Sequence, residues 1–245
     1  MNDFSDIDNL SKQVEQLMLE QQQLLSIVSH DLRSPLNRVF ALIQLMQMNS
    51  SNLTVEQKNY LEKIHLVIAD GLAMMRNMVD YRNLEYRSID LHPEKFNAVT
   101  LVESCVKNFS AIAEKKNIRL TVSCEPDLTM FTDKQCMARV IDNLLANAVK
   151  FSPAGTTVSV RAGCTHAHLK IDIRDEAPGF RAEEVSRIFQ KFQKLSARPT
   201  AGESSTGLGL FVAQAMAEKI GGEITCSTKA GVGSVFSAEL PKTIG

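Results

Sequence analysis

The sequence SHDLRSPLN, residues 29–37, places a histidine beside an aspartate and a proline five residues after the histidine, in a stretch that otherwise has helical periodicity. Upstream of it, a heptad repeat is formed by Ile7, Leu10, Val14, Leu17, Leu24 and Val28, with Gln21 at one seam position. Apolar spacing continues to Met46, which predicts one helix over about residues 5–48 that needs a partner helix. Pro35 lacks an amide hydrogen and clashes with the carbonyl of Asp31, so we expect a bend just after the histidine.

A second helix is predicted after the polar loop NSSNLT, residues 49–54. Thr54 can cap this helix, with Glu56 and Gln57 in its first turn. Its apolar stripe consists of Ile64, Ile68, Leu72, Met75 and Val79. Two helices joined by a short loop form an antiparallel hairpin, and a stripe this wide is best covered by a second copy. We therefore expect a homodimeric four-helix bundle.

The composition is that of an ordinary globular protein. The chain has 245 residues, 44% of them hydrophobic, and 27 Lys and Arg balance 28 Asp and Glu. This balance gives no excess charge for nucleic acid or an anionic membrane, and no apolar run is long enough for a membrane helix. The five cysteines are widely spaced, which suits reduced core thiols. We expect a cytoplasmic chain that contacts neither nucleic acid nor membrane.

The pattern changes at about residue 90, after which helical and alternating segments mix. IDLHPEKFN, residues 89–97, is rich in turn formers. The predicted helices cover residues 98–115 and 133–151, and the predicted strands cover 118–124, 156–163, 168–175 and a hairpin within 222–240. These segments predict an α+β fold with helices on one face of a mixed or antiparallel sheet.

The second of these helices has a polar face. Asn143, Asn147 and Lys150 are spaced i, i+4 and i+7, so they share one side, while apolar residues cover the other. Two amides and one ammonium supply an oxygen for a hard cation and donors for phosphate, as a magnesium nucleotide requires. A solvated helix face would have the same spacing, so the pattern alone leaves both readings open.

Two glycine-bearing stretches follow: DEAPGF, residues 175–180, and STGLGL, residues 205–210. Gly207 and Gly209 would let backbone amides approach a phosphate at a helix N-terminus, although ordinary turns use the same residues. The segment between them, residues 181–204, ends rich in Ser, Pro and Gly, as a mobile flap over a ligand would. Phe189 and Phe192 are candidates to hold this flap down.

Five stretches, in this order, resemble the motifs of sensor histidine kinases of two-component signalling. SHDLRSPL resembles the H box, DNLLANAVKFSP the N box, DEAPGF the first glycine box, IFQKF the F box and STGLGL the second glycine box. The resemblance covers nearly the whole chain after about residue 20. It implies a phosphotransfer domain and an ATP-binding α/β sandwich of the gyrase, chaperone and histidine kinase type, with ATP and Mg²⁺ as cofactors.

The resemblance also implies roles for single residues. His30 would be the phosphoacceptor, Asp31 the neighbouring acid or base, and Ser34 occupies the position used for phosphatase activity. The implied nucleotide site consists of Asn143, Asn147, Lys150, Phe151, Asp175, Gly179, Lys194, Gly207, Leu208 and Gly209. Within it, Asn147 would bind magnesium, Asp175 would read the adenine amino group, Asn143 and Lys150 would contact phosphate, and Lys194 would meet the γ-phosphate. A neutral imidazole is a nucleophile that an adjacent carboxylate can orient, which agrees with the assignment of His30.

The implied organisation has three parts. Residues 1–25 would form a coiled-coil signalling helix, residues 26–90 the dimerisation and histidine phosphotransfer domain, and residues 91–245 the catalytic ATP-binding domain. The implied partners are a second copy of the chain, a response-regulator receiver whose aspartate accepts the phosphoryl group, and an upstream sensor.

Some positions depart from the motif pattern, among them Ala177, Ser205 and Ser34. Ala177 stands where the first glycine box usually has Gly, and a side chain there is costly if the backbone needs a positive φ. We therefore expect ATP binding to be modestly weakened. Two alternatives remain at this point: a non-catalytic phosphotransfer or adaptor dimer with a weakened ATP site, and an ATPase of the same superfamily that has no histidine acceptor.

Overall fold

The computed structural model describes residues 31–86 and 90–244, together with Gln13 and Gln16, which are helical. His30 and most of the predicted N-terminal heptad repeat lie outside the described residues. The chain divides into two compact units, Met1–Arg82 and Asn83–Gly245.

The first unit contains a helical hairpin. Residues 31–48 are helical, and a 3-10 turn, η1 (Ser50–Asn52), leads into α2 (Val55–Tyr86). The Thr54 hydroxyl accepts a hydrogen bond from the Gln57 amide at 3.2 Å, and the Gln57 side chain accepts one from the Thr54 amide at 2.9 Å. This reciprocal pair is a capping box, so the predicted cap at Thr54 is confirmed.

Contacts between the two helices run in antiparallel register. The rings of Phe40 and His65 lie 4.7 Å apart, and Leu36 approaches the Gly71 position within 3.9 Å. Ile43 and Leu61 are buried. The predicted antiparallel hairpin is therefore confirmed, and residues 31–48 remain helical through Pro35.

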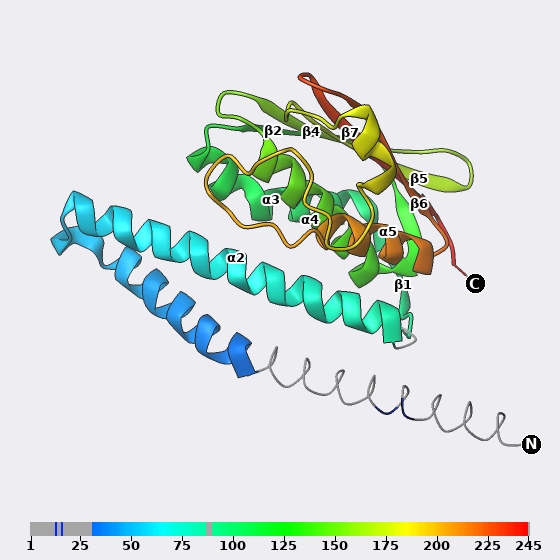
Figure 1. Cartoon of the computed structure of the whole chain (residues 1–245). Helices are drawn as coiled ribbons and strands as arrows, with labels where there is room; N and C mark the ends of the chain where they lie inside the picture. The colour runs from blue at the N-terminus through cyan, green and yellow to red at the C-terminus, as the bar shows by residue number, and fades with distance from the viewer. Residues whose placement is uncertain (1–12, 14–15, 17–30, 87–89, 245) are drawn as a thin grey trace, which may run out of the picture. The chain divides into compact units, whose positions relative to one another are not determined.

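The second unit is built on a five-stranded sheet with the order β2-β4-β5-β7-β6. The strands are β2 (Arg119–Cys124), β4 (Thr157–Cys164), β5 (His168–Asp175), β6 (Glu223–Lys229) and β7 (Gly233–Pro241). β2 and β4 are parallel and the other pairs are antiparallel, as predicted for a mixed sheet. In Figure 1, the helices α3 (Ala98–Lys115), α4 (Lys134–Phe151) and α5 (Gly209–Lys219) lie on one face of this sheet.

Side-chain alternation explains how the helices and this sheet share a core. In β5, Leu169, Ile171 and Ile173 are fully buried, while the residues between them are more exposed. α4 contributes Val140 and Leu144, which are also fully buried. Removing this apolar surface from water is the main stabilising term for the unit.

The sequence prediction for residues 89–97 was wrong. The turn-rich passage 89–97 contains a strand, β1 (Pro93–Asn97), which pairs antiparallel with β3 (Thr129–Asp133). β1 has no apolar alternation, because four of its five side chains are exposed, and its partner lies more than 30 residues away in the chain. Local periodicity gives no signal for such a pair.

A long connection joins β5 to α5. It begins with the DEAPGF turn, passes through a 3-10 segment, η2 (Ala182–Arg187), and ends at Leu208. Residues 181–204 of this connection are the flap named above. None of the described helices is both long and apolar enough to span a bilayer.

Candidate nucleotide site

Asp175 ends β5 and is the most deeply buried acidic side chain of the predicted site, at 4% exposure. Its Oδ1 accepts hydrogen bonds from the amides of Ala177 at 3.0 Å and Ser234 at 3.1 Å. Burial raises the pKa of this carboxyl to about 6. Within the described part of the chain no residue donates to Oδ2, so this oxygen can accept from a ligand amino group.

Ser234 was missed from the sequence. It is the second residue of β7, and Gly231, in the preceding turn, and Gly233, at the start of β7, indicated only a hairpin. The Ser234 hydroxyl shares a hydrogen bond with Thr228 at 2.9 Å, and Thr228 in turn accepts from the Phe180 amide at 3.0 Å. The hairpin therefore holds both Asp175 and the turn that follows it.

Gly179 is required by its surroundings. Its φ is +66°, and a Cβ at this position would lie 2.5 Å from the Lys229 carbonyl oxygen. The turn is closed on its other side by a 2.7 Å hydrogen bond from the Gly231 amide to the Pro178 carbonyl. Any side chain at position 179 would thus push the turn off the hairpin.

Ala177 does not carry the strain that the sequence suggested. Among the described non-glycine residues, positive φ occurs at Asn117, Asp127 and Phe192, and not at Ala177. The methyl group is buried at 8% exposure. The backbone strain expected at Ala177 is therefore absent, because the backbone has no need of glycine there, and the expected weakening of ATP binding loses its physical reason.

The polar face of α4 is not an ordinary solvated face. Asp133 caps this helix by accepting from the Cys136 amide at 2.8 Å, which fixes where the helix begins. Asn143 is 6% exposed, and its amide donates to the Arg139 carbonyl at 3.0 Å. Asn147 and Lys150 are half-buried, and the Lys150 ammonium donates to the Ser204 carbonyl of the flap. The face meets the flap at least at Lys150.

The F box and the second glycine box pack together. Gly207 has a φ of +69°, and a Cβ there would lie 2.5 Å from the Gln193 carbonyl oxygen. The Phe192 amide donates to the Gly207 carbonyl at 3.0 Å. Leu208 is 1% exposed and Gly209 is the first residue of α5. Only glycine fits position 207, because the flap backbone occupies the space of a side chain.

The two phenylalanines of the F box differ. Phe189 packs edge-to-face on Phe236 of β7 with ring centroids 6.5 Å apart, so it holds the flap as expected. Phe192 is 55% exposed and contacts Gly207 through its backbone amide. Lys194 is exposed in the flap, and Phe151, the last residue of α4, is half-buried.

The remaining predicted residues belong to the hairpin. Asp31 and Ser34 are exposed on the first described helix, where a spacing of three places them on one side. His30 lies outside the described residues. The two glycine boxes, the F box and the polar face of α4 all lie in the second unit, Asn83–Gly245.

Two domain families match this chain in the order that the motifs suggest. Residues 20–86 match the His Kinase A (phospho-acceptor) domain, and residues 132–244 match the histidine kinase-, DNA gyrase B- and HSP90-like ATPase domain. The chain belongs to the sensor histidine kinases. The match over 20–86 includes the SHDLRSPL stretch, and the ATPase match includes both glycine boxes.

Sensor histidine kinases are also the curated relatives. The chain is 30% identical over 231 residues to the sensor protein EvgS of Escherichia coli O157:H7, covering 91% of this chain and 19% of that protein. It is 30% identical over 229 residues to the sensor protein GacS of Pseudomonas syringae pv. syringae, covering 90% of this chain and 25% of that protein. The chain thus spans between about a fifth and a quarter of the length of these relatives.

Solved histidine kinases have the same fold. Full-length ShkA in complex with AMPPNP matches with a TM-score of 0.67 and 24% identity, covering 91% of this chain and 46% of that chain. Acinetobacter baumannii AdeS matches with a TM-score of 0.61 and 21% identity, covering 88% of this chain and 98% of that chain. A helical region followed by an α/β domain is therefore the architecture of this chain.

Proposed function

We propose that this chain is the autokinase core of a sensor histidine kinase, which transfers the γ-phosphoryl group of ATP to His30. The observation that carries the proposal is the buried Asp175, whose one oxygen is held by two backbone amides while the other faces no protein donor among the described residues. This arrangement suits recognition of an adenine amino group. Residues 20–86 match a phospho-acceptor domain, so the proposed second substrate, a histidine side chain, would lie on the same chain.

In the proposed reaction a ring nitrogen of His30 attacks the γ-phosphorus, a new N–P bond forms, and the bond to the ADP oxygen breaks. The carboxylate of Asp31 stabilises the positive charge that develops on the ring during the attack and then takes the proton from the other ring nitrogen, which leaves the ring neutral. ADP leaves with the electron pair of the broken bond. The phosphoryl group then passes to an aspartate of a separate response-regulator receiver.

Magnesium fits this site as a nucleotide-borne ion. No cluster of three His, Cys, Asp or Glu side chains that could hold a metal occurs among the described residues. Mg²⁺ commonly keeps phosphate oxygens and water as most of its ligands, so one amide oxygen from Asn147 would be enough. When bound, the ion would neutralise charge on the leaving phosphates. Asn143, Lys150 and Lys194 are the proposed phosphate contacts.

The hairpin is proposed to dimerise. It leaves large apolar side chains exposed, among them Leu42 at 60%, Leu45 at 55% and Val67 at 70%. Covering this surface with a second copy would produce the four-helix bundle. The proposed domain limits stay at residues 1–25, 26–90 and 91–245, with sensor input reaching the chain through the first segment. Ser34 is the proposed position for phosphatase activity.

The proposal is tested by incubating the chain with γ-labelled ATP and Mg²⁺, with and without a receiver domain. A phosphohistidine gives a label that is lost in acid and retained in alkali, and adding a cognate receiver should move the label to the receiver. An ATPase without a histidine acceptor would release labelled phosphate and leave the protein unlabelled. A non-catalytic adaptor with a weakened ATP site would neither acquire the label nor release labelled phosphate.

A further inference from the structure

The end of α4 accepts a set of hydrogen bonds from residues at the end of α3 and in the flap that lie outside the sequence motifs. Thr200 donates to the Lys150 carbonyl through its amide at 3.1 Å and through its hydroxyl at 3.2 Å. The same hydroxyl lies 3.0 Å from the Ser152 carbonyl. The last carbonyls of a helix have no partner within the helix, so the flap satisfies groups that would otherwise need water.

Lys116 joins this set from the C-terminal end of α3. Its side chain is only 9% exposed. The ammonium donates to the carbonyls of Val149 at 2.8 Å and Lys150 at 2.9 Å, and to Glu203 of the flap at 3.0 Å. An ammonium has three hydrogens, so these three acceptors use its full capacity.

Glu203 completes the connection from the flap side. Its side chain is 13% exposed, and its second oxygen accepts from the Ala201 amide at 2.9 Å. Burial acts to raise the pKa of this carboxyl, but the hydrogen bonds from backbone amides and from Lys116 outweigh burial and hold the pKa below its ordinary value. Lys116 and Glu203 therefore form a hydrogen-bonded ion pair, and removing one partner would leave the other buried without its counter-charge.

The bound segment also touches the proposed phosphate contact. The next flap residue, Ser204, accepts from the Lys150 ammonium through its backbone carbonyl. Residues 200–204 thus hold both the last turn of α4 and the side chain of Lys150. A flap fixed at this point loses less conformational freedom when it orders around a nucleotide.

We infer that Lys116, Thr200 and Glu203 form a latch that fixes the flap to the end of α4 and pre-positions Lys150 for the phosphates of ATP. This inference rests on the proposed function of the site. Lys116 and Glu203 act through the flap and through Lys150, so they are positioning residues and take no part in the chemistry. The latch lies entirely within the second unit.

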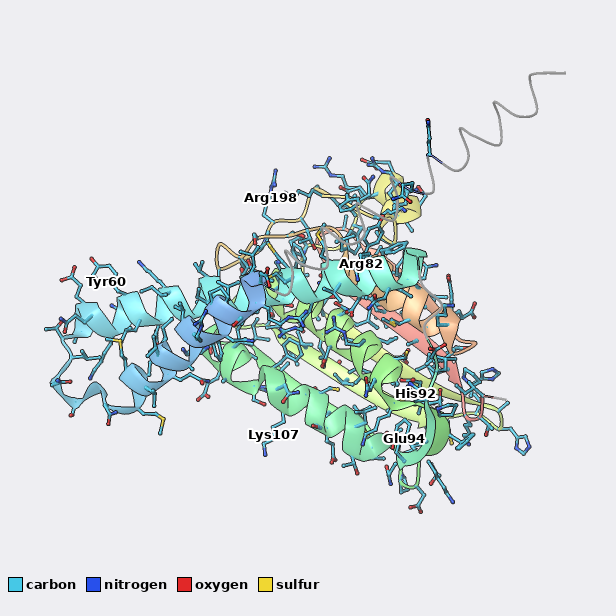
Figure 2. The ribbon with its side chains drawn as sticks, turned by 90° about the horizontal axis from the view of Figure 1, so that it is seen from below. Tyr60, Arg82, His92, Glu94, Lys107 and Arg198 are labelled. Atoms are coloured by element: carbon cyan, nitrogen blue, oxygen red, sulfur yellow. The ribbon has the colours of Figure 1, made fainter. Side chains whose placement is uncertain are left out.

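The test compares Lys116→Met and Glu203→Gln with two matched controls in the full chain. Lys107→Met changes an exposed lysine of α3, and Arg198→Met changes an exposed arginine of the flap; Figure 2 shows both side chains pointing outward. We expect each latch variant to weaken binding of a fluorescent ATP analogue about tenfold, because the flap must then be ordered at the expense of binding. Phosphoryl transfer at saturating ATP should change less than twofold, and both controls should match the unchanged chain.

A double variant separates the latch from a general effect on folding. If the two residues act as one device, Lys116→Met and Glu203→Gln together should weaken binding little more than either change alone. Glu203→Gln keeps the size of the side chain but loses its charge and one of its two acceptor oxygens, so it tests the latch even if Lys116→Met folds poorly. Unchanged affinity per folded molecule in Glu203→Gln would overturn the inference.

Hydrogen exchange gives a measure that needs neither ATP nor His30. The amides of Thr200 and Ala201 donate into the latch, so they should exchange about tenfold faster in both variants and at the normal rate in both controls. Normal protection in the variants would overturn the latch. If the unchanged chain bound no nucleotide, the proposed function would fail, while this measurement would still decide whether the latch exists.

Discussion

At the scale of single residues, the buried position of Asp175 suits the proposed contact with a ligand but lowers the stability of the folded protein at neutral pH. Its burial raises the carboxyl pKa from 3.8 to about 6, so the ionised form is disfavoured in the folded protein. The folded state then holds a proton more tightly than the unfolded state. Stability from this group is greatest below pH 4 and is lost as the pH rises through about 6.

Asp175→Asn should therefore stabilise the nucleotide-free protein at pH 7.5. The difference between 3.8 and about 6 corresponds to at most about 3 kcal/mol, and the asparagine oxygen can still accept from both amides. We expect the melting temperature of the variant to rise by about 5 °C at pH 7.5, and this gain should shrink toward pH 4. The variant should also lose ATP binding. Glu176→Gln, at the exposed neighbouring position, is the control. A melting temperature that fell at pH 7.5 would contradict this account of the buried charge.

Ala177→Gly tests whether the departure from the glycine motif matters. The backbone of Ala177 has no positive φ, so glycine relieves no strain and only adds freedom to the unfolded chain. We expect unchanged affinity for a non-hydrolysable ATP analogue in calorimetric titration, and a loss of stability of about 0.5–1 kcal/mol. Tighter binding by the glycine variant would show that the nucleotide-bound turn needs a backbone conformation that alanine resists.

At the scale of elements, sequence periodicity predicted α3, α4 and the strands of the main sheet almost to the residue. These elements have regular alternation or a clear cap, such as Asp133 before α4. The sequence pattern did not predict β1 and β3, because their pairing joins two short segments that are distant in the chain. A prediction from local pattern alone can reach only those elements whose buried face is visible within one segment.

A prediction at this scale concerns the capping box at the start of α2 and the stability of the first turn of that helix. Thr54→Ala removes the hydroxyl that accepts from the Gln57 amide, so the first turn of α2 should lose about 1 kcal/mol of stability. Hydrogen exchange at the amides of Gln57 and Lys58 should become about fivefold faster. Ser51→Ala, at an exposed position in the same connection, should leave these rates as they are. Equal rates in Thr54→Ala would mean that tertiary packing alone fixes the start of the helix.

At the scale of the whole molecule, the motifs predicted the family, but they did not predict how the residues of the candidate site are held. Ser234 reaches Asp175 across 59 positions of sequence, and Lys116 reaches the flap across 87. Such contacts depend on the folded sheet and on the packing of α3 beside α4. The predicted roles of His30, Asn147 and Lys194 remain predictions, because they concern a phosphoryl group and a nucleotide.

The central claim is that His30 receives the phosphoryl group from ATP, and replacing this residue by Gln tests it most directly. The measurement is incorporation of label from γ-labelled ATP with Mg²⁺, alongside binding of a fluorescent ATP analogue to the same preparation. Because the acceptor and the predicted nucleotide site belong to different units of the chain, His30→Gln should lose all acid-labile label and keep the affinity of the unchanged chain for the analogue. Acid-labile label retained on the His30→Gln protein would contradict the account.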